Sequence, residues 1–213
     1  MFFKASCIGL KSYLMSHRET IDLQQHREPL LKILHHIITR PDLSRRELDQ
    51  LLREIPKGRD SMYSRDELIS AYRAFAGTAL PPFDQSILER LRRKPVRTSS
   101  GVTPVTVLTK PFPCPGECIF CPNDVRMPKS YLSDEPGAQR AEQNSFDPYL
   151  QTYTRLQSYH NTGHPTDKIE IIILGGTWSF YPESYQIWFI KRIFDAMHDF
   201  GRGQDRRSEV EAA

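Results

Sequence analysis

The sequence contains little cysteine and no long apolar run. Only four of its 213 residues are cysteine, which is too few for the disulfide framework that stabilises small secreted domains. No stretch approaches the roughly 18 consecutive apolar residues of a transmembrane helix. Lys4 and Lys11 interrupt the N-terminal residues, so a secretory signal is not supported. We therefore expect a cytoplasmic protein without a membrane contact.

The overall composition is that of a globular protein. Hydrophobic residues make up 38% of the chain and charged residues 26%, which suits one large or two small domains and excludes disorder throughout. Residues 1–17 form an uncertain N-terminal extension, since they lack acidic side chains and Met15 is an alternative start. Cys7 lies in this extension, and we assign it no role.

Positive charge is concentrated in the first part of the chain. Residues 1–97 contain 18 Lys and Arg and 12 Asp and Glu. Residues 98–213 contain 11 Lys and Arg and 14 Asp and Glu, so this part is acidic. The two parts together give the net charge of +3. The basic cluster that closes the first part consists of Arg90, Arg92, Arg93, Lys94 and Arg97. Such a cluster attracts the phosphate backbone of nucleic acids. Cations that stabilise a helix C-terminus are an equally good interpretation of the charge alone.

Apolar periodicity predicts a helical domain over residues 18–94. The expected helices span Ile21–Thr39, Ser44–Ile55, Ser64–Gly77, and Asp84 into the basic cluster. Ser44 with Glu47 fits a capping box, and the same spacing recurs at Ser64 and Glu67. Pro29 could divide the first helix.

Strands and helices alternate over residues 95–200. The expected order is a strand over Val96–Thr109 interrupted near Gly101 and Pro104, a partly helical segment over Pro136–Tyr159, a strand over Lys168–Leu174, and a helix over Ser184–Phe200. The second strand is a nearly continuous apolar run, so we expect it to be buried on both faces of a parallel sheet. The apolar side expected for the last helix comprises Ile187, Trp188, Ile190, Ile193, Phe194 and Met197. The fold class is therefore α/β, with residues 201–213 as a polar tail.

Three of the four cysteines stand together as Cys114-Pro-Gly-Glu-Cys118-Ile-Phe-Cys121. The surrounding prolines and Gly116 indicate a turn-rich loop rather than a core segment. Thiolates bind iron-sulfur clusters, normally one to each iron, so three thiolates on a four-iron cluster leave one iron open for another ligand. The C-x3-C-x2-C spacing resembles the radical S-adenosylmethionine (SAM) superfamily, in which SAM binds the open iron.

A structural zinc site is the main alternative for these cysteines. Zinc takes four ligands, and the fourth would have to be His160 or His164, well beyond the loop. The second pair of ligands typical of such sites is missing from the sequence. We therefore predict that Cys114, Cys118 and Cys121 are ligands of a [4Fe-4S] cluster.

A glycine pair follows the second predicted strand at once. Ligand sites in parallel sheets lie at the carboxyl ends of the strands, and both the cysteine loop and Gly175-Gly176 come directly after a predicted strand. Glycine lets a backbone approach a ligand closely, although any tight turn could also require it. We predict that Gly175, Gly176 and Thr177 contact the methionyl end of SAM.

Several other segments narrow the resemblance to one family. They are Arg97–Val102, Pro113–Pro122, Lys129–Tyr131, Phe146–Tyr149, Gly163–Lys168 and Gly175–Trp178. With these segments, the sequence over about residues 20–200 resembles the catalytic subunit of Elongator and its single-chain bacterial and archaeal counterparts. The fold implied is a small N-terminal helical domain followed by the first strand–helix units of an incomplete radical SAM (partial TIM-like) barrel.

The resemblance implies an enzyme that modifies tRNA. In the family, cleavage of SAM on a [4Fe-4S] cluster yields a radical that abstracts hydrogen from an acetyl group delivered by acetyl-CoA. A carboxymethyl-type group is then formed at carbon 5 of the wobble uridine. Phe120, beside the last cysteine, would contact the cofactor together with the glycine turn, and the basic cluster would bind tRNA.

The chain departs from this family in its length. We expect a fragment without the acetyltransferase domain, whose incomplete barrel leaves an apolar face exposed unless a partner chain covers it. Its oligomeric state is left open. Two alternatives remain, namely a non-catalytic tRNA-binding module and another radical SAM oxidoreductase with a small substrate.

Overall fold

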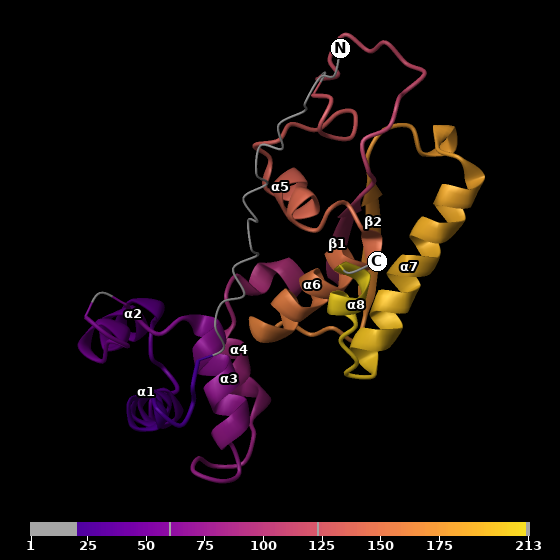
Figure 1. The fold of residues 1–213 in the computed structure, drawn as a ribbon. Helices are drawn as coiled ribbons and strands as arrows, with labels where there is room; N and C mark the ends of the chain where they lie inside the picture. The colour runs from indigo at the N-terminus through magenta and orange to yellow at the C-terminus, as the bar shows by residue number, and fades with distance from the viewer. Residues whose placement is uncertain (1–20, 60, 123, 212–213) are drawn as a thin grey trace, which may run out of the picture.

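The computed structural model describes residues 21–59, 61–122 and 124–211, so Cys7 and Met15 lie outside the described residues. A helical region occupies one end of the molecule and a mixed α/β region the other (Figure 1). The first contains α1 (Arg27–Thr39), α2 (Arg45–Glu54), α3 (Arg65–Phe75) and α4 (Gln85–Leu91). The second contains η1 (Pro95–Thr98), β1 (Thr103–Leu108), α5 (Pro136–Gln143), α6 (Pro148–Asn161), β2 (Ile169–Leu174), η2 (Trp178–Phe180), α7 (Glu183–Gly201) and α8 (Arg207–Glu211). Within these ranges, no helix combines the length and apolarity needed to cross a bilayer.

Both predicted capping boxes are present. The side chain of Ser44 accepts from the backbone N–H of Glu47, while Glu47 accepts from the backbone N–H of Ser44. Ser64 and Glu67 make the same reciprocal pair at the start of α3. Two N–H groups that a helix terminus would otherwise leave without partners are satisfied in each case.

The first helix differs from its prediction. It begins at Arg27 rather than Ile21, because Asp22 accepts hydrogen bonds from the backbone N–H groups of Gln24 and Gln25 and holds a turn there. Pro29 lies in the first turn of α1, where it removes no intrahelical bond, and so does not divide the helix. The four helices bury a common core formed mainly by Leu, Ile, Tyr72 and Phe75.

The two strands are parallel and adjacent, as predicted. Their register pairs Thr103 with Ile169 and Leu108 with Leu174. The first strand is shorter than expected, because residues 95–98 form a 3-10 helix instead of extended chain. Lys94 has a left-handed backbone, with φ of 54°, and the N–H of Arg97 donates to its carbonyl, which turns the chain before β1.

The second strand is not buried on both faces, contrary to the prediction. Its residues Ile169, Ile171 and Ile173 pack beneath α6 and α7. Glu170 and Ile172 are exposed on the other face, opposite Pro104 and Thr106 of β1. Within the described residues, the carboxyl end of that face is covered where Leu108 and Leu174 meet Ala138 and Ala141 of α5.

The buried side of α7 also differs from its prediction. Phe189, Ile193 and Ala196 are buried, whereas Ile187, Trp188 and Phe194 are among the exposed large hydrophobic residues. Apolar side chains lie nearly all round this helix, so periodicity alone did not distinguish the two sides. An exposed apolar face was expected, and these three side chains provide one.

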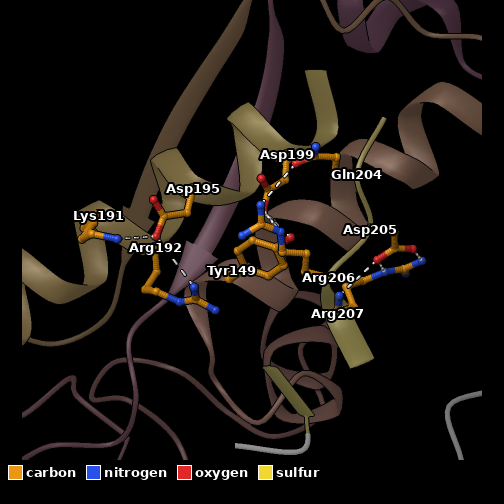
Figure 2. A network of polar contacts seen from close by, with 9 residues as sticks. All are labelled: Tyr149, Lys191, Arg192, Asp195, Asp199, Gln204, Asp205, Arg206 and Arg207. Atoms are coloured by element: carbon orange, nitrogen blue, oxygen red, sulfur yellow. Dashed lines mark hydrogen bonds and ion pairs between the residues drawn. The ribbon is translucent and has the colours of Figure 1, made fainter. Parts of the chain in front are cut away.

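Residues 202–211 turn back against the α/β region (Figure 2). Asp199, which is buried at the end of α7, accepts a 2.9 Å hydrogen bond from the hydroxyl of Tyr149 and pairs at 3.8 Å with Arg206. The guanidinium of Arg207 lies 5.0 Å from the ring centre of Tyr153. These contacts place α8 against α6, within the segment expected to form a polar tail.

Candidate functional site

The cysteine loop and the glycine pair leave the sheet at the same end. The two parallel strands finish together at Leu108 and Leu174, and the N–H of Thr109 donates 2.9 Å to the carbonyl of Leu174. Residues 109–130 then form the loop, while Gly175 and Gly176 follow the second strand. The prediction that both segments lie at the carboxyl ends of parallel strands is confirmed.

Gly175 occupies a position that no other residue can take without rearrangement. Its φ of +151° is unfavourable for residues with a side chain, and a Cβ placed there would lie 1.9 Å from Oγ1 of Thr109. At Gly176, an added Cβ would lie at an ordinary 3.5 Å from Cβ of Lys129. The glycine turn therefore touches both the beginning and the end of the cysteine loop.

A stack of three aromatic rings fixes the beginning of the loop. Phe112 stacks on Tyr181 with ring centres 4.9 Å apart, and Tyr181 stacks on Tyr185 at 5.2 Å. The hydroxyl of Tyr181 lies 2.7 Å from Oγ1 of Thr109 and donates 3.1 Å to the carbonyl of Lys110. The N–H of Lys110 donates 3.0 Å to Tyr185, whose pKa is raised to about 12 mainly by burial.

Cys114 is the cysteine that meets the glycine turn directly. Its Sγ lies 3.3 Å from Oγ1 of Thr177. The Thr177 hydroxyl is the main cause of a lowered pKa for the Cys114 thiol, followed by the backbone of Gly116 and of Thr177 and by the charge of Lys129. These neighbours favour the thiolate, which is the form that binds metals.

The other two cysteines lie on the same loop, and all three are free thiols. A Cβ at Gly116 would lie 3.6 Å from Sγ of Cys118 and 3.9 Å from Sγ of Cys114, so these two sulfurs are near neighbours. Cys121 lies one turn further on, with its N–H bonded to the carbonyl of Cys118. Its Sγ lies 3.7 Å from Oγ of Ser130.

Phe120 lies on the exposed tip of the loop. Its side chain is 93% exposed, and its predicted contact with the cofactor stays a prediction. Ile119 and Val125 are exposed on the same loop. The loop therefore presents an apolar surface around the cysteines.

The described residues contain no group of three or more His, Cys, Asp or Glu side chains arranged to hold a metal ion. His164, one of the two histidines considered as a zinc ligand, precedes β2 and therefore lies at the opposite end of the sheet from the cysteines. Its ring bonds to Oγ1 of Thr98 at 2.9 Å and to the carbonyl of Arg93 at 3.0 Å. Both ring nitrogens of His164 are therefore used in contacts that link the helical and α/β regions.

The predicted basic cluster divides into two groups. Arg90 donates to the carbonyl of Arg40, and Arg92 donates 2.7 Å from Nε to the carbonyl of Gly163. Arg93, Lys94 and Arg97 are exposed instead. The first group stabilises the fold, and the second is available to a ligand.

Sequence reasoning missed Thr109, Phe112, Tyr181 and Tyr185, which together hold the loop to the sheet. Their bonds join residues about 70 positions apart, such as Thr109 and Tyr181. The only local signal was the place of Thr109 at the end of a predicted strand. The pairing itself depends on the parallel register.

Comparison with known proteins identifies relatives that match about half of the chain. No family model matches the sequence. A "tRNA uridine(34) acetyltransferase" of Methanocaldococcus infernus is 51% identical over 115 residues, which are 51% of this chain and 22% of the relative. The protein of the same name from Dehalococcoides mccartyi is 47% identical over 106 residues, 50% of this chain and 23% of the relative. "Elongator complex protein 3" of Homo sapiens is 37% identical over 131 residues, 56% of this chain and 24% of the relative.

The chain is a homologue of these proteins. The predicted resemblance is thereby confirmed over about half of the chain. The homologous segment covers less than a quarter of each relative's length. The activity, substrates and partners of the full-length relatives are therefore only proposals for this chain.

Proposed function

We propose that Cys114, Cys118 and Cys121 hold a [4Fe-4S] cluster and that Gly175, Gly176 and Thr177 bind SAM beside it. The observation that carries this proposal is the 3.3 Å approach of the Cys114 sulfur to the Thr177 hydroxyl, which joins the thiol loop to the glycine turn. Both segments lie where ligands bind in parallel α/β folds.

The donor set suits an iron-sulfur cluster. Three free thiols lie on one exposed loop, and iron-sulfur clusters take thiolates as ligands. The sulfurs of Cys114 and Cys118 both lie within 4 Å of the position of a Cβ on Gly116, but the described residues form no three-ligand group, so the loop would have to rearrange to bring the three thiols onto one cluster. Proline and glycine residues before and between the cysteines fit a loop that can rearrange.

In this proposal the protein positions the reactants. A cluster held by the three cysteines would supply the electron needed to cleave SAM. The ring stack of Phe112, Tyr181 and Tyr185 orients the loop, and the absence of a side chain at Gly176 lets a ligand approach the backbone. The apolar tip around Phe120 would exclude water from the site once it is covered.

We further propose that the substrate is tRNA and that the site serves formation of a carboxymethyl-type group at carbon 5 of the wobble uridine. The name of two relatives, tRNA uridine(34) acetyltransferase, supports tRNA as the substrate and an acetyl compound as the donor. Acetyl-CoA is the donor in this proposal. The parallel strand pair is proposed to be the beginning of a radical SAM barrel.

Anaerobic reconstitution with iron and sulfide tests the cluster. The full chain should develop a broad absorption near about 400 nm from thiolate-to-iron charge transfer, with about four irons per chain. Cys118→Ala should lose this absorption, whereas Cys7→Ala, which removes the one cysteine outside the loop, should retain it. Unit-stoichiometry zinc in protein purified without oxygen, or an unchanged spectrum in Cys118→Ala, would overturn the proposal.

The same preparation distinguishes the second candidate, a non-catalytic tRNA-binding module. This candidate is supported by the exposed side chains of Arg93, Lys94 and Arg97 at the end of the helical region. It predicts salt-sensitive tRNA binding by a variant lacking all three loop cysteines, with no cluster in the parent chain.

A further inference from the structure

One side of α7 is exposed along the whole helix. The helix lies on the outer side of the α/β region (Figure 1), and Phe189, Ile193 and Ala196 on its inner side are buried. On the outer side, Ile187 is 62% exposed and Phe194 is 53% exposed. The residues that run along this outer side, all of them exposed, are Ser184, Ile187, Lys191, Phe194 and His198. We call these five residues the outer seam.

The spacing of the outer seam is that of a helix that packs along another helix. Its residues are separated alternately by three and by four positions, which is the repeat at the contact between paired helices. Ile187 and Phe194 are seven positions apart and therefore lie at equivalent places, with Trp188 beside Ile187. The helix has 19 residues, which is about 28 Å at roughly 1.5 Å per residue. Large apolar side chains gathered on one exposed side, rather than scattered, are typical of an interaction surface.

The outer seam also contains both signs of charge one turn apart. Lys191 donates 2.7 Å to the carboxylate of Asp195, which borders the seam. Figure 2 shows this carboxylate between Lys191 and Arg192, whose guanidinium lies 3.7 Å away. The Lys191 side chain is 69% exposed, so its ion pair adds little to the stability of the fold. Lys191 can therefore exchange this partner for an equivalent carboxylate at little cost.

This arrangement is complementary to itself. If two copies of α7 pack antiparallel about a two-fold axis beside residues 192 and 193, Lys191 of each copy lies next to Phe194 and Asp195 of the other. The aliphatic part of the lysine then covers the aromatic ring, and its ammonium group reaches the carboxylate. Two-fold contacts of this kind use the same surface on both copies. A parallel pair would instead place Lys191 against Lys191, which like charges disfavour.

We propose that the outer seam of α7 is a docking surface for α7 of a second copy of this chain, in antiparallel orientation. The inference is independent of the proposed cofactor and of tRNA, because it uses only side chains on α7. One helix pair lies near or below the lower end of the roughly 1,200–2,000 Å² that stable interfaces bury. The dimer should therefore be weak and should dissociate on dilution.

Sedimentation equilibrium of the full chain over a series of concentrations tests the dimer. A reductant must be present, so that disulfides between the free loop thiols do not contribute. The parent should show a monomer–dimer equilibrium. Ile187→Ser/Phe194→Ser should weaken it by at least about tenfold, because the apolar part of the seam carries most of the association. Met62→Ser/Val96→Ser, which removes two exposed apolar side chains outside α7, is the matched control and should dimerise like the parent.

A mixing experiment tests whether the partner is a second copy in this orientation. Lys191→Glu leaves only acidic groups at positions 191 and 195, and Asp195→Lys leaves only basic ones, so each variant alone should dimerise more weakly than the parent. In an equimolar mixture, the two carboxylates of the first variant face the two ammonium groups of the second. The mixture should therefore associate more tightly than either variant alone. Because both substitutions are at exposed or half-exposed positions, this test does not depend on the serine variant folding.

The outcomes are distinct. A parent chain that remains monomeric at all concentrations would overturn the inference and would leave the outer seam to another segment or partner. A serine variant that dimerises like its control, or a mixture no tighter than its components, would overturn it as well. Circular dichroism at low concentration should show parent-like helix content in every variant. Reconstitution of the 400 nm absorption is measured separately, so failure of the cluster proposal leaves this inference unaffected.

Discussion

The hydroxyl groups of Thr109 and Tyr181 lie 2.7 Å apart at the carboxyl end of the sheet. Thr109 is the first residue after β1, and Tyr181 follows the glycine turn that comes after β2. Both side chains are buried. This contact joins the two segments that carry the proposed cofactor ligands, so it fixes where the cysteine loop starts.

Tyr181→Phe should destabilise the protein by about 1–3 kcal/mol, because it leaves the buried hydroxyl of Thr109 without this partner and the carbonyl of Lys110 without a donor. Chemical denaturation measures the free energy of unfolding. Tyr131→Phe is the control, since its hydroxyl makes no hydrogen bond within the described residues, and it should cost less than about 0.5 kcal/mol. Equal effects of the two substitutions would show that the hydroxyl contact is unimportant.

Gly175→Ala should destabilise by about 2–4 kcal/mol, because it combines backbone strain with a clash against Thr109. Adding Thr109→Ala removes the clashing oxygen but not the strain, so it should restore only part of the loss. Gly201→Ala is the matched control at the end of α7, where an added Cβ meets no atom within 4 Å. It should leave stability unchanged or raise it by up to about 1 kcal/mol. A tolerated alanine at 175 would contradict the model of a tightly packed turn.

Tyr149→Phe should loosen residues 202–211. Burial, followed by the hydrogen bond to Asp199, raises the pKa of Tyr149 to about 12, and loss of this donor leaves the buried carboxylate of Asp199 with only the longer contact to Arg206. We expect a loss of about 1–3 kcal/mol and faster amide exchange in α8. Tyr153→Phe, which removes a hydroxyl without a hydrogen bond in the described residues, should leave the exchange of α8 as it is.

Stability should fall as pH decreases below 6.5. Burial, with Arg92, Arg97 and Arg155 nearby, lowers the pKa of His164 below its ordinary value of 6.5 despite the opposing bond to the carbonyl of Arg93. The unfolded state therefore binds a proton at a higher pH than the folded state, so stability is full above 6.5 and is lost toward the folded pKa. His160, whose pKa burial also lowers, adds to this trend.

Thermal unfolding between about pH 5 and 8 measures this dependence, which follows from the linkage between protonation and folding. His164→Gln can keep a bond to the carbonyl of Arg93 without titrating, so it should flatten the curve. His36→Gln, an exposed histidine on α1, should reproduce the parent curve. A His164→Gln curve parallel to the parent would assign the pH dependence to other groups.

The local elements were largely predictable from the sequence. The capping boxes at Ser44 and Ser64 form as predicted, because each uses side chains only three residues apart. The parallel pairing was also predictable, since two β-branched runs separated by a helical segment favour it. Given that pairing, the cysteine loop and Gly175 necessarily emerge at one end of the sheet.

The details of burial were not predictable in the same way. The exposure of Ile172 depends on which helices cover the sheet, and the buried side of α7 depends on where Tyr185 and Phe189 meet the strand ends. Residues 95–98 contain β-branched side chains yet form a 3-10 helix, because Lys94 turns the chain and His164 holds Thr98. Each outcome was decided by a partner distant in sequence.

The sequence by itself determined the thiol set, the helix boundaries at the capping boxes, the strand order and the relationship to the tRNA uridine(34) acetyltransferases. Only the tertiary structure decided that Cys114 meets Thr177, that Thr109 meets Tyr181, and that Thr98 meets His164. The physical reason is the range of the interactions. Capping and periodicity act over a few residues along the chain, whereas these hydrogen bonds arise only when packing brings distant segments together.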